Sequence, residues 1–440
     1  MLILIIAWIL GLTGCQQNEI SESTKINLSD DVILVNGETI SKNTDAAVYA
    51  ANDIIFYLEN QDITYGEGTE ADAHSQAEAD AHTVIHITEP GIYEFTGNLK
   101  AGQIFVDLGD GTKNDRNAVA TLVLNDVDIS CTVAPAILFY RTYECADDNE
   151  EDAVMEVDTS AAGANLVLAD GSINRVYGSY VAKIYESCEL NEAGTEVVDS
   201  KKLHKYDGAV FSRRSMNISG TGALEVLAEN EGICSEMHLT INGGDINITS
   251  GNDGVNTSED NVSVFAMNEG TLSIQVTGET GEGDGIDSNG WLVVNGGTVN
   301  SFGCATSIDS GIDADKGIYI NGGLVIATGN MPAEVAEGKQ TVLSFAGRDT
   351  LEAGKKYEVK DAESNVVLEV SPDNAFTILT VSSDELLADG KYAVWQEDRQ
   401  IADGMSGATG MFRPEMKPGR TMPEGMKPPE GMEPPERLRK

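Results

Sequence analysis

The sequence predicts an all-β fold in which short strands stack as a solenoid, and two repeated motifs lead to this prediction. In the first motif, an Asn recurs every 26 or 27 residues, always after an apolar residue and mostly before Gly-Gly. These residues are Asn242, Asn268, Asn295 and Asn321. A repeat of this length, with strand-like content and no helix-length unit, is typical of three short strands and three corners per turn. The Asn side chains are predicted to hydrogen-bond up and down the stack, which is a structural role.

The second motif is an acidic residue followed by Gly and an apolar residue. It occurs at Asp207, Glu231, Asp253 and Asp284, and a fifth copy carries Ser310 in the acidic position. In the later copies, a further polar side chain follows the apolar residue. If the turns stack in register, the acids form one column and these polar side chains form a second, at a strand spacing of about 4.8 Å.

Stacked carboxylates at this spacing predict a bound cation. Two neighbouring carboxylates repel each other by roughly 3 kcal/mol at an effective dielectric constant near 20. Repeated oxygen ligands favour Ca²⁺ over softer metals. The predicted ligands are Glu231, Asp253, Asn256, Asp284, Asp287 and Asp313. The alternative is that these are solvated acids at corners, where Asp-Gly is a common turn pair.

The N-terminal residues predict export. An apolar run from Met1 to Leu10 is too short to span a bilayer and has the length of a signal-peptide core, although no Lys or Arg precedes it. The segment Leu12-Thr13-Gly14-Cys15 resembles the bacterial lipobox, which implies cleavage before Cys15 and lipidation of its thiol. We therefore expect a signal peptide over residues 1–15, a tether over 16–30, and a lipid anchor as the sole membrane contact, on the extracellular face of a bacterial membrane.

The rest of the chain divides into a long strand-rich region and a tail. Residues 31–403 are predicted to be one solenoid domain, with charged, irregular loops at 141–160 and 183–203. Residues 404–440 contain most of the 11 prolines and half of the 12 methionines, and this composition predicts a disordered tail. The formal net charge of −44 argues against nucleic acid as a partner, because binding phosphates requires a basic surface. We expect a monomer.

Taken together, the lipobox, the strand pattern from Thr83 to Ile87, and the repeated Asp-Gly-Ile and Asn-Gly-Gly motifs resemble a known family. It comprises bacterial carbohydrate-binding-domain proteins that form a right-handed parallel β-helix. The resemblance spans roughly residues 30–400 and implies binding of Ca²⁺ and of cellulose or polygalacturonate. It places Ca²⁺ near Asp253, Asp284, Asp287 and Asp313. This sequence departs from the family pattern at Ser310 and Cys234.

The predicted function is therefore non-catalytic, Ca²⁺-dependent binding of plant-type polysaccharide at the cell surface. Candidate residues for stacking on sugar rings are the aromatic side chains Trp291, Tyr319, Phe302 and Phe265. Two alternatives stay open. One is a polysaccharide lyase of the pectate-lyase type, which would need a basic side chain for proton abstraction. The other is a surface adhesin or spacer without a sugar ligand.

Overall fold

The computed structural model describes residues 23–336 and 338–405, and these consist almost entirely of strands and their connections. The helical elements in this part of the chain are α1 (Gln76–Ala79) and the short 3-10 helix η1 (Thr112–Asn114). The predicted all-β class is therefore confirmed. None of the helices among the described residues has the length and apolar character needed to cross a membrane.

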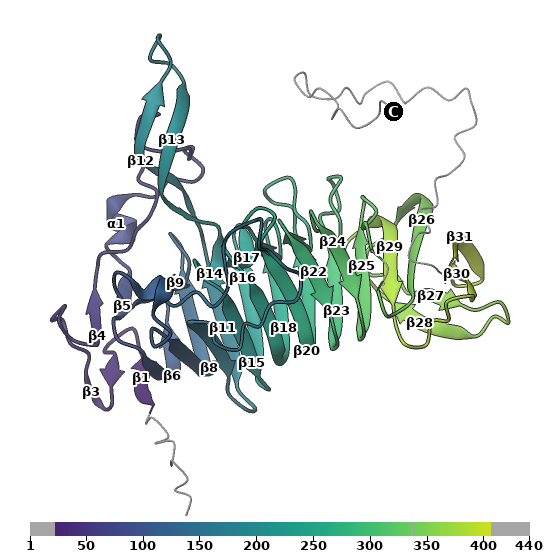
Figure 1. The fold of residues 1–440 in the computed structure, drawn as a ribbon, viewed down its shortest axis with the longest axis horizontal. Helices are drawn as coiled ribbons and strands as arrows, with labels where there is room; N and C mark the ends of the chain where they lie inside the picture. The colour runs from purple at the N-terminus through teal and green to yellow at the C-terminus, as the bar shows by residue number, and fades with distance from the viewer. Residues whose placement is uncertain (1–22, 337, 406–440) are drawn as a thin grey trace, which may run out of the picture. The chain divides into compact units, whose positions relative to one another are not determined.

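Four sheets contain the strands of the described residues (Figure 1). The largest sheet has 17 strands: β1 (Thr24–Leu28), β2 (Leu34–Val35), β3 (Glu38–Thr39), β6 (Gly91–Leu99), β8 (Ala120–Cys131), β10 (Ala164–Leu168), β11 (Ile173–Gly178), β15 (Met216–Gly220), β16 (Ala223–Ala228), β18 (Leu239–Ser250), β20 (Val264–Val276), β22 (Trp291–Val294), β23 (Thr298–Phe302), β24 (Gly317–Ile320), β25 (Leu324–Gly329), β26 (Val342–Leu351) and β29 (Phe376–Ser382). The second sheet has eight strands: β4 (Val48–Ala51), β5 (Thr83–Ile87), β7 (Gly102–Asp107), β9 (Ile137–Arg141), β14 (Gly208–Ser212), β17 (Glu231–Ser235), β19 (Val255–Thr257) and β21 (Ile286–Ser288). The other two sheets are the hairpin of β12 (Val181–Leu190) and β13 (Val197–Tyr206), and a four-stranded sheet of β27 (Tyr357–Lys360), β28 (Val366–Val370), β30 (Lys391–Gln396) and β31 (Arg399–Met405).

The pairings in the largest sheet correct the predicted fold class. Parallel pairs connect β8 to β10, β10 to β15, β15 to β18, β18 to β16, β16 to β11, and β11 back to β8. This ring of six strands is a closed parallel barrel with further strands attached, so the prediction of an open right-handed parallel β-helix, or solenoid, is wrong.

The ring closes because its long strands bend without ending. In β18, Gly243 and Gly244 have φ of +152° and +94°, in the region where a side chain would be strained. In β8, Asp126 adopts a positive φ of 57° at the corresponding bend. The sequence motif predicted separate strands on either side of an Asn-Gly-Gly corner. At Asn242, one strand, β18, instead continues through the corner and pairs with β15 before it and with β16 after it. Separate strands do flank Asn295 and Asn321, as the motif predicted.

The Asn repeat does position a continuous core. The apolar residues that precede the repeated Asn residues pair in register, Ile241 with Met267, Met267 with Val294, and Val294 with Ile320. All of them are fully buried. In-register stacking of this motif is therefore confirmed, and the same register controls where the polar side chains on the outside lie.

The predicted segment boundaries need several corrections. The signal peptide of residues 1–15, with lipidation at Cys15, lies outside the described residues, and so do 16–22 and 406–440. Residues 24–28, expected within the tether, form β1, whose Ile26 and Leu28 are buried against the core. Residues 404 and 405, expected in the tail, belong to β31.

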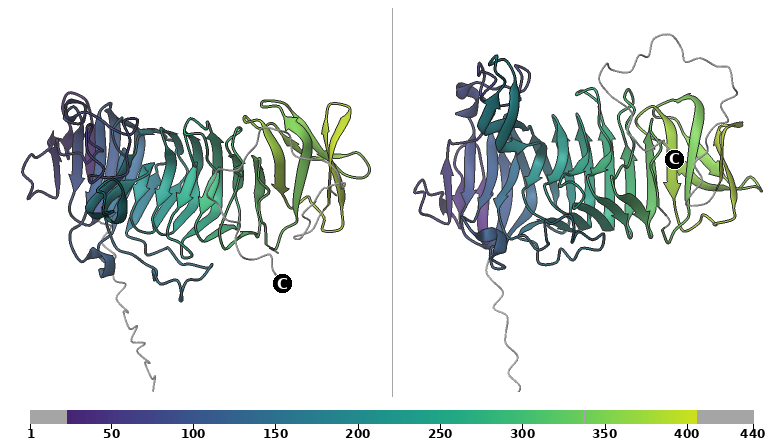
Figure 2. Two further views of the ribbon diagram at one scale, coloured as in Figure 1. Left: turned by 90° about the horizontal axis from the view of Figure 1, so that it is seen from above. Right: turned by 45° about the horizontal axis from the view of Figure 1, so that its top comes forward.

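The segment 183–203, predicted to be an irregular loop, forms the β12–β13 hairpin, which stands apart from the larger sheets (Figures 1 and 2). Its charged residues misled the prediction because a two-stranded ribbon exposes both faces to water. The C-terminal part also differs, because β29 pairs antiparallel with β25 and β26, and the four-stranded sheet is antiparallel throughout. This part has a second hydrophobic cluster around Phe345, Tyr357 and Phe376, so residues 31–403 are not one uniform parallel stack.

Candidate metal centre

The acid–Gly–apolar motif begins the short strand β17, and its apolar residue begins β19 and β21 of the same eight-stranded sheet. Ile233 pairs with Val255 and Val255 with Ile286, all parallel, and an isolated bridge connects Ile286 to Ile312. This register stacks the following side chains in one row, namely Cys234, Asn256, Asp287 and Asp313. By the same count, Glu231, Asp253 and Asp284 stack in a second row that ends at Ser310.

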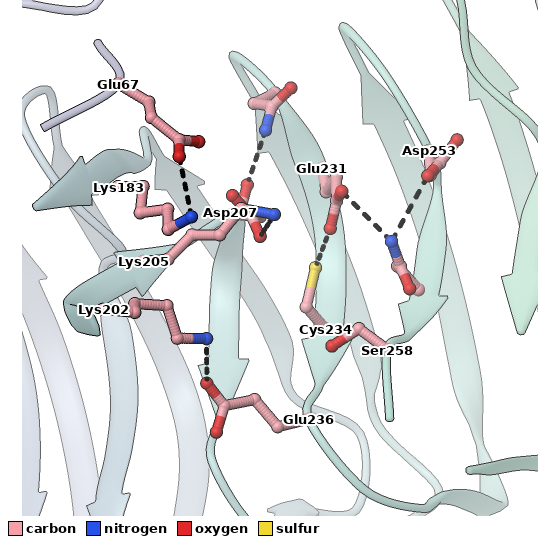
Figure 3. Close-up of polar contacts among 12 residues, drawn as sticks. Glu67, Lys183, Lys202, Lys205, Asp207, Glu231, Cys234, Glu236, Asp253 and Ser258 are labelled. Carbon is pink, nitrogen blue, oxygen red and sulfur yellow. Dashed lines mark hydrogen bonds and ion pairs between the residues drawn. The ribbon is translucent and has the colours of Figure 1, made fainter. Parts of the chain in front are cut away.

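Asp207 does not belong to the second row. Gly208, not Asp207, is opposite Glu231, so the predicted alignment of Asp207 is wrong by one residue. The carboxylate of Asp207 instead pairs with Lys205 of β13, with 3.1 Å between Nζ and Oδ2 (Figure 3). The hairpin therefore supplies a cation at the β14 end of the acidic rows.

Three of the predicted ligands converge. One carboxylate oxygen each from Asp284, Asp287 and Asp313 lies within 4.8 Å of the other two. We call these residues the three-carboxylate cluster. All three side chains are partly buried, and each comes from the row position that the motif specifies. Such a set of hard oxygen donors suits Ca²⁺ better than a softer metal.

Asn256 stands next to the cluster, since it pairs with Asp287 across β19 and β21. Its Nδ2 donates to Glu231 Oε1 at 3.1 Å and, at 3.4 Å, to Asp253 Oδ2. Its Oδ1 is buried and has no hydrogen-bond partner within residues 23–336 and 338–405. A buried amide oxygen without a donor is costly, and coordination to a cation would satisfy it. The donor set therefore fits a calcium ion.

Two further predicted ligands, Glu231 and Asp253, are not part of the cluster. Glu231 accepts from Asn256 at one carboxylate oxygen and from Cys234 Sγ, at 2.8 Å, at the other (Figure 3). Asp253 accepts the backbone N–H of Asp284 at 2.7 Å as well as the Asn256 amide. Both carboxylates thus accept hydrogen bonds from a neighbouring turn, while the charge of Asp253 still acts on Asp284.

Burial and mutual repulsion make these carboxylates costly to ionise. Burial raises the pKa of Asp284 to about 8, and repulsion from Asp253 and Asp313 adds to the shift. Burial, together with Asp313, raises the pKa of Asp287 to about 6. Burial and the nearby Asp207 raise the pKa of Glu231 to about 8. Near neutral pH, a proton or another cation bound in these rows would relieve this cost.

Sequence reasoning missed Asp309 and Asp315. Asp309 accepts the backbone N–H of Gly283 at 2.6 Å, and its charge helps to raise the pKa of Asp287 and Asp313. Asp315 also raises the pKa of both groups. Neither residue recurs from turn to turn, so the repeat gave no signal for them.

The aromatic candidates divide into two groups. Trp291 and Tyr319 are half-buried on neighbouring strands of the largest sheet, and Lys316 Nζ lies 4.5 Å from the Trp291 ring centroid. Phe265 is fully buried in the core, so its prediction as a sugar-stacking residue is wrong. Phe302 packs against the second hydrophobic cluster.

Comparisons with known proteins place this geometry in context. A family model described as carbohydrate-binding domain-containing protein matches residues 81–162 and 148–378. A carbohydrate-binding domain-containing protein of Acetivibrio thermocellus is 29% identical over 165 residues, which are 37% of this chain. The chain spans only 44% of the length of that relative. A solved structure, a gadolinium derivative of the polysaccharide lyase-like protein from C. thermocellum, is 21% identical with a TM-score of 0.39; the match covers 72% of this chain and 100% of that one.

Proposed function

The chain belongs to the family of carbohydrate-binding domain-containing proteins, and from this premise we propose that it is a non-catalytic protein that binds plant-type polysaccharide, polygalacturonate or cellulose, with Ca²⁺. We further propose that it acts on the extracellular face of a bacterial membrane, anchored by a lipid on Cys15. The observation that carries the calcium part is the three-carboxylate cluster, with its oxygens within 4.8 Å of one another.

Asp284, Asp287 and Asp313 would bind the ion, and Asn256, whose Oδ1 has no partner among the described residues, would add a neutral ligand from the strand paired with Asp287. Ca²⁺ takes six to eight oxygen ligands, so the remaining positions stay open to water or to a sugar. A bound ion would offset the repulsion between the acids and hold the strands β19 and β21 in register with the segment around Ile312.

The same ion provides a way for a very acidic protein to bind an acidic polysaccharide. With a formal net charge of −44, the surface repels polygalacturonate at low ionic strength. A divalent cation held by protein carboxylates can also accept a uronate carboxylate. A neutral glucan needs no such bridge and would bind through hydrogen bonds and aromatic stacking.

The geometry gives a pectate-lyase type mechanism less support. In the region of the repeats, Arg213 is a candidate base, but its guanidinium is 3.3 Å from Glu236 Oε2 and stacks over the Tyr140 ring. Lys316 donates to the Asn261 carbonyl oxygen at 2.8 Å and lies over Trp291. Both cations are thus engaged within the protein. The third cation of this region, Arg214, donates from Nη1 to the Arg213 carbonyl oxygen at 3.2 Å, and its Nε is buried without a partner among the described residues.

A pull-down with parallel monitoring of product tests the proposal. The full chain is incubated with insoluble cellulose and with immobilised polygalacturonate, in calcium and in chelator. We expect retention in calcium, release from polygalacturonate in chelator, and no rise in the absorbance of unsaturated uronides. A rise in that absorbance would identify a lyase instead, and absence of retention on every glycan would leave the adhesin or spacer function.

A further inference from the structure

The segment between β9 and β10 covers part of the outer face of the largest sheet (Figure 1). Its anchor is Thr159, whose hydroxyl lies 2.8 Å from both Asn217 Oδ1 and Thr240 Oγ1. Asn217 in turn donates to the Thr159 carbonyl oxygen at 2.7 Å. These groups are buried, so they hold the segment firmly over the sheet.

A groove of about 450 Å³ lies between residues 155–160 of this segment and the strands β18, β20 and β22. The side chains that form its floor are small. Thr240 pairs with Ala266, and Ala266 with Val293, in one row across the three strands. The groove is a feature of the fold, since it depends on a covalently connected segment held by buried hydrogen bonds.

His238 lines the groove and has an unmet hydrogen-bonding capacity. The residue is only 2% exposed, and neither ring nitrogen has a hydrogen-bond partner among the residues that the structure describes. Burial lowers its pKa, against an opposing effect of Glu144, and this favours the neutral ring, which has one N–H donor and one acceptor nitrogen. A buried donor or acceptor left unpaired costs about 1–3 kcal/mol. A hydroxyl group in the groove would satisfy it.

The repeated Asn residues border the same groove. Each donates from Nδ2 to the Oδ1 of the preceding one, Asn268 to Asn242 at 2.8 Å, Asn295 to Asn268 and Asn321 to Asn295 at 2.9 Å each. The ladder uses one N–H and one oxygen lone pair of a central amide, so a second N–H and a second lone pair remain. The result is a line of donor and acceptor pairs at the strand spacing of about 4.8 Å, which matches an extended chain of hydroxyl groups.

The charges that line the groove disfavour an anionic ligand. Glu156 and Asp158 lie on the covering segment and Lys339 at the Asn321 end, while burial favours the neutral form of His238. There is no cluster of cations to receive a uronate, and the two carboxylates would repel it. The lining instead offers amide, hydroxyl and imidazole groups.

We propose that this groove binds a segment of a neutral, hydroxyl-rich glycan chain, with hydrogen bonds from His238 and from the Asn row. This inference rests on the proposed carbohydrate-binding function and assigns it a location distinct from the three-carboxylate cluster. The rows that form the floor continue onto the predicted aromatic residues, because Val264 pairs with Trp291 and Val293 with Tyr319. A chain that leaves the groove in this direction reaches both rings.

Blocking the groove tests the assignment. Ala266→Phe fills the floor, and Gln275→Phe adds the same side chain to the same strand, β20, outside the groove lining. Binding of cellohexaose is measured by calorimetry in calcium, with the calcium-induced rise in Tm as the control for folding. We expect Ala266→Phe to weaken binding by about tenfold or more, Gln275→Phe by less than about twofold, and both to keep the rise in Tm.

His238→Phe separates a ligand-binding role from a structural one. Replacing an unpaired buried polar ring by an apolar one of similar size is neutral or stabilising in the free protein. We therefore expect an unchanged or higher Tm together with weaker cellohexaose binding. Loss of stability with unchanged binding would show that His238 has a structural role alone.

The outcomes distinguish this inference from the function on which it rests. If the wild type and Ala266→Phe bind cellohexaose equally, the groove is excluded and the proposed function stands. If Ala266→Phe loses polygalacturonate binding and the wild type ignores cellohexaose, the neutral ligand is wrong. If the wild type binds no glycan at all, the proposed function itself fails.

Discussion

Asn256 donates from Nδ2 to Glu231 Oε1 at 3.1 Å across one pair of strands, and this hydrogen bond fixes the direction of its amide. Because the nitrogen is committed to the carboxylates of Glu231 and Asp253, the oxygen is left buried without a donor. The hydrogen bond thus leaves an unpaired amide oxygen on the residue that pairs with Asp287, and under the proposed function this oxygen is a neutral ligand for the ion.

Asp284→Asn should remove much of the calcium response without damage to the metal-free protein. The amide keeps an oxygen that can accept the Ser310 N–H, which lies 2.5 Å from Asp284 Oδ1, while the charge in the cluster is lost. An ion at about 100 times its Kd stabilises the wild type by about 2.7 kcal/mol, and we expect most of this to disappear. Thermal unfolding in calcium and in chelator measures it.

Glu282→Gln is the matched control, since this acid is exposed and only two residues away. It should leave the calcium response unchanged. An equal loss of stability for Asp284→Asn in calcium and in chelator would contradict a metal-binding role for this residue.

The stability of the metal-free protein should carry a contribution that falls as the pH rises. The folded pKa values of Glu231 and Asp284 are about 8, above the usual values of unfolded chains near 4. Between these limits the folded state holds protons that the unfolded state has released, so the free energy of unfolding decreases with increasing pH. The contribution is complete below about pH 4 and lost above about pH 8. Calcium competes with these protons, so its stabilising effect should grow over the same range.

Glu231→Gln isolates this effect from the other carboxylates of the chain. Its amide cannot ionise, so the variant lacks the stability that the wild type loses as the pH rises. In chelator, the Tm of the variant minus that of the wild type should therefore increase from about pH 5 to about pH 8. A difference that does not change with pH would show that the Glu231 pKa is not raised.

Asn268→Ala should cost more stability than Asn321→Ala. Asn268 makes two ladder hydrogen bonds, one to Asn242 and one from Asn295, whereas Asn321 makes a single one. These hydrogen bonds are exposed to solvent, so we expect about 1 kcal/mol for the central variant and about half of that for the terminal one. Urea unfolding measures both, and equal losses would mean that the ladder does not contribute through its hydrogen bonds.

The sequence was informative where a short motif determines the local register. The apolar residues before each Asn and the polar residues at 256, 287 and 313 lie in the rows that the motifs predicted. It failed where the length of a turn varies. The step from Ile233 to Val255 is shorter than the step from Val255 to Ile286, so the motif alone could not show that Asp207 is out of register.

The closure of the six-stranded barrel also could not be predicted from a local sequence pattern. The ring of β8, β10, β15, β18, β16 and β11 depends on bends inside β8 and β18. Glycines permit the bend in β18, but their presence in the sequence does not predict that the strand continues through it. The groove depends on Thr159, a residue in a segment without periodicity that meets Asn217 and Thr240 only in the folded chain. His238, which lines the groove, belongs to no recognisable sequence motif.

Lys205→Met should destabilise the protein in a pH-dependent way that calcium does not correct. Lys205 pairs with the buried Asp207 at 3.1 Å, and burial raises the pKa of that carboxyl group even with the lysine present. Without the lysine, ionised Asp207 faces Glu231 with Lys202 as a remaining nearby cation, and the weaker compensation opposes folding. Half of the Lys205 side chain is exposed, so solvent screening limits the expected loss to about 1–2 kcal/mol near pH 8. At lower pH, protonation of Glu231 removes the repulsion, and the loss should shrink. The double variant Lys205→Met/Asp207→Asn should recover most of the stability, because the unpaired charge is gone. If the double variant is no more stable than Lys205→Met, the lysine acts through packing of its aliphatic chain and not through its charge.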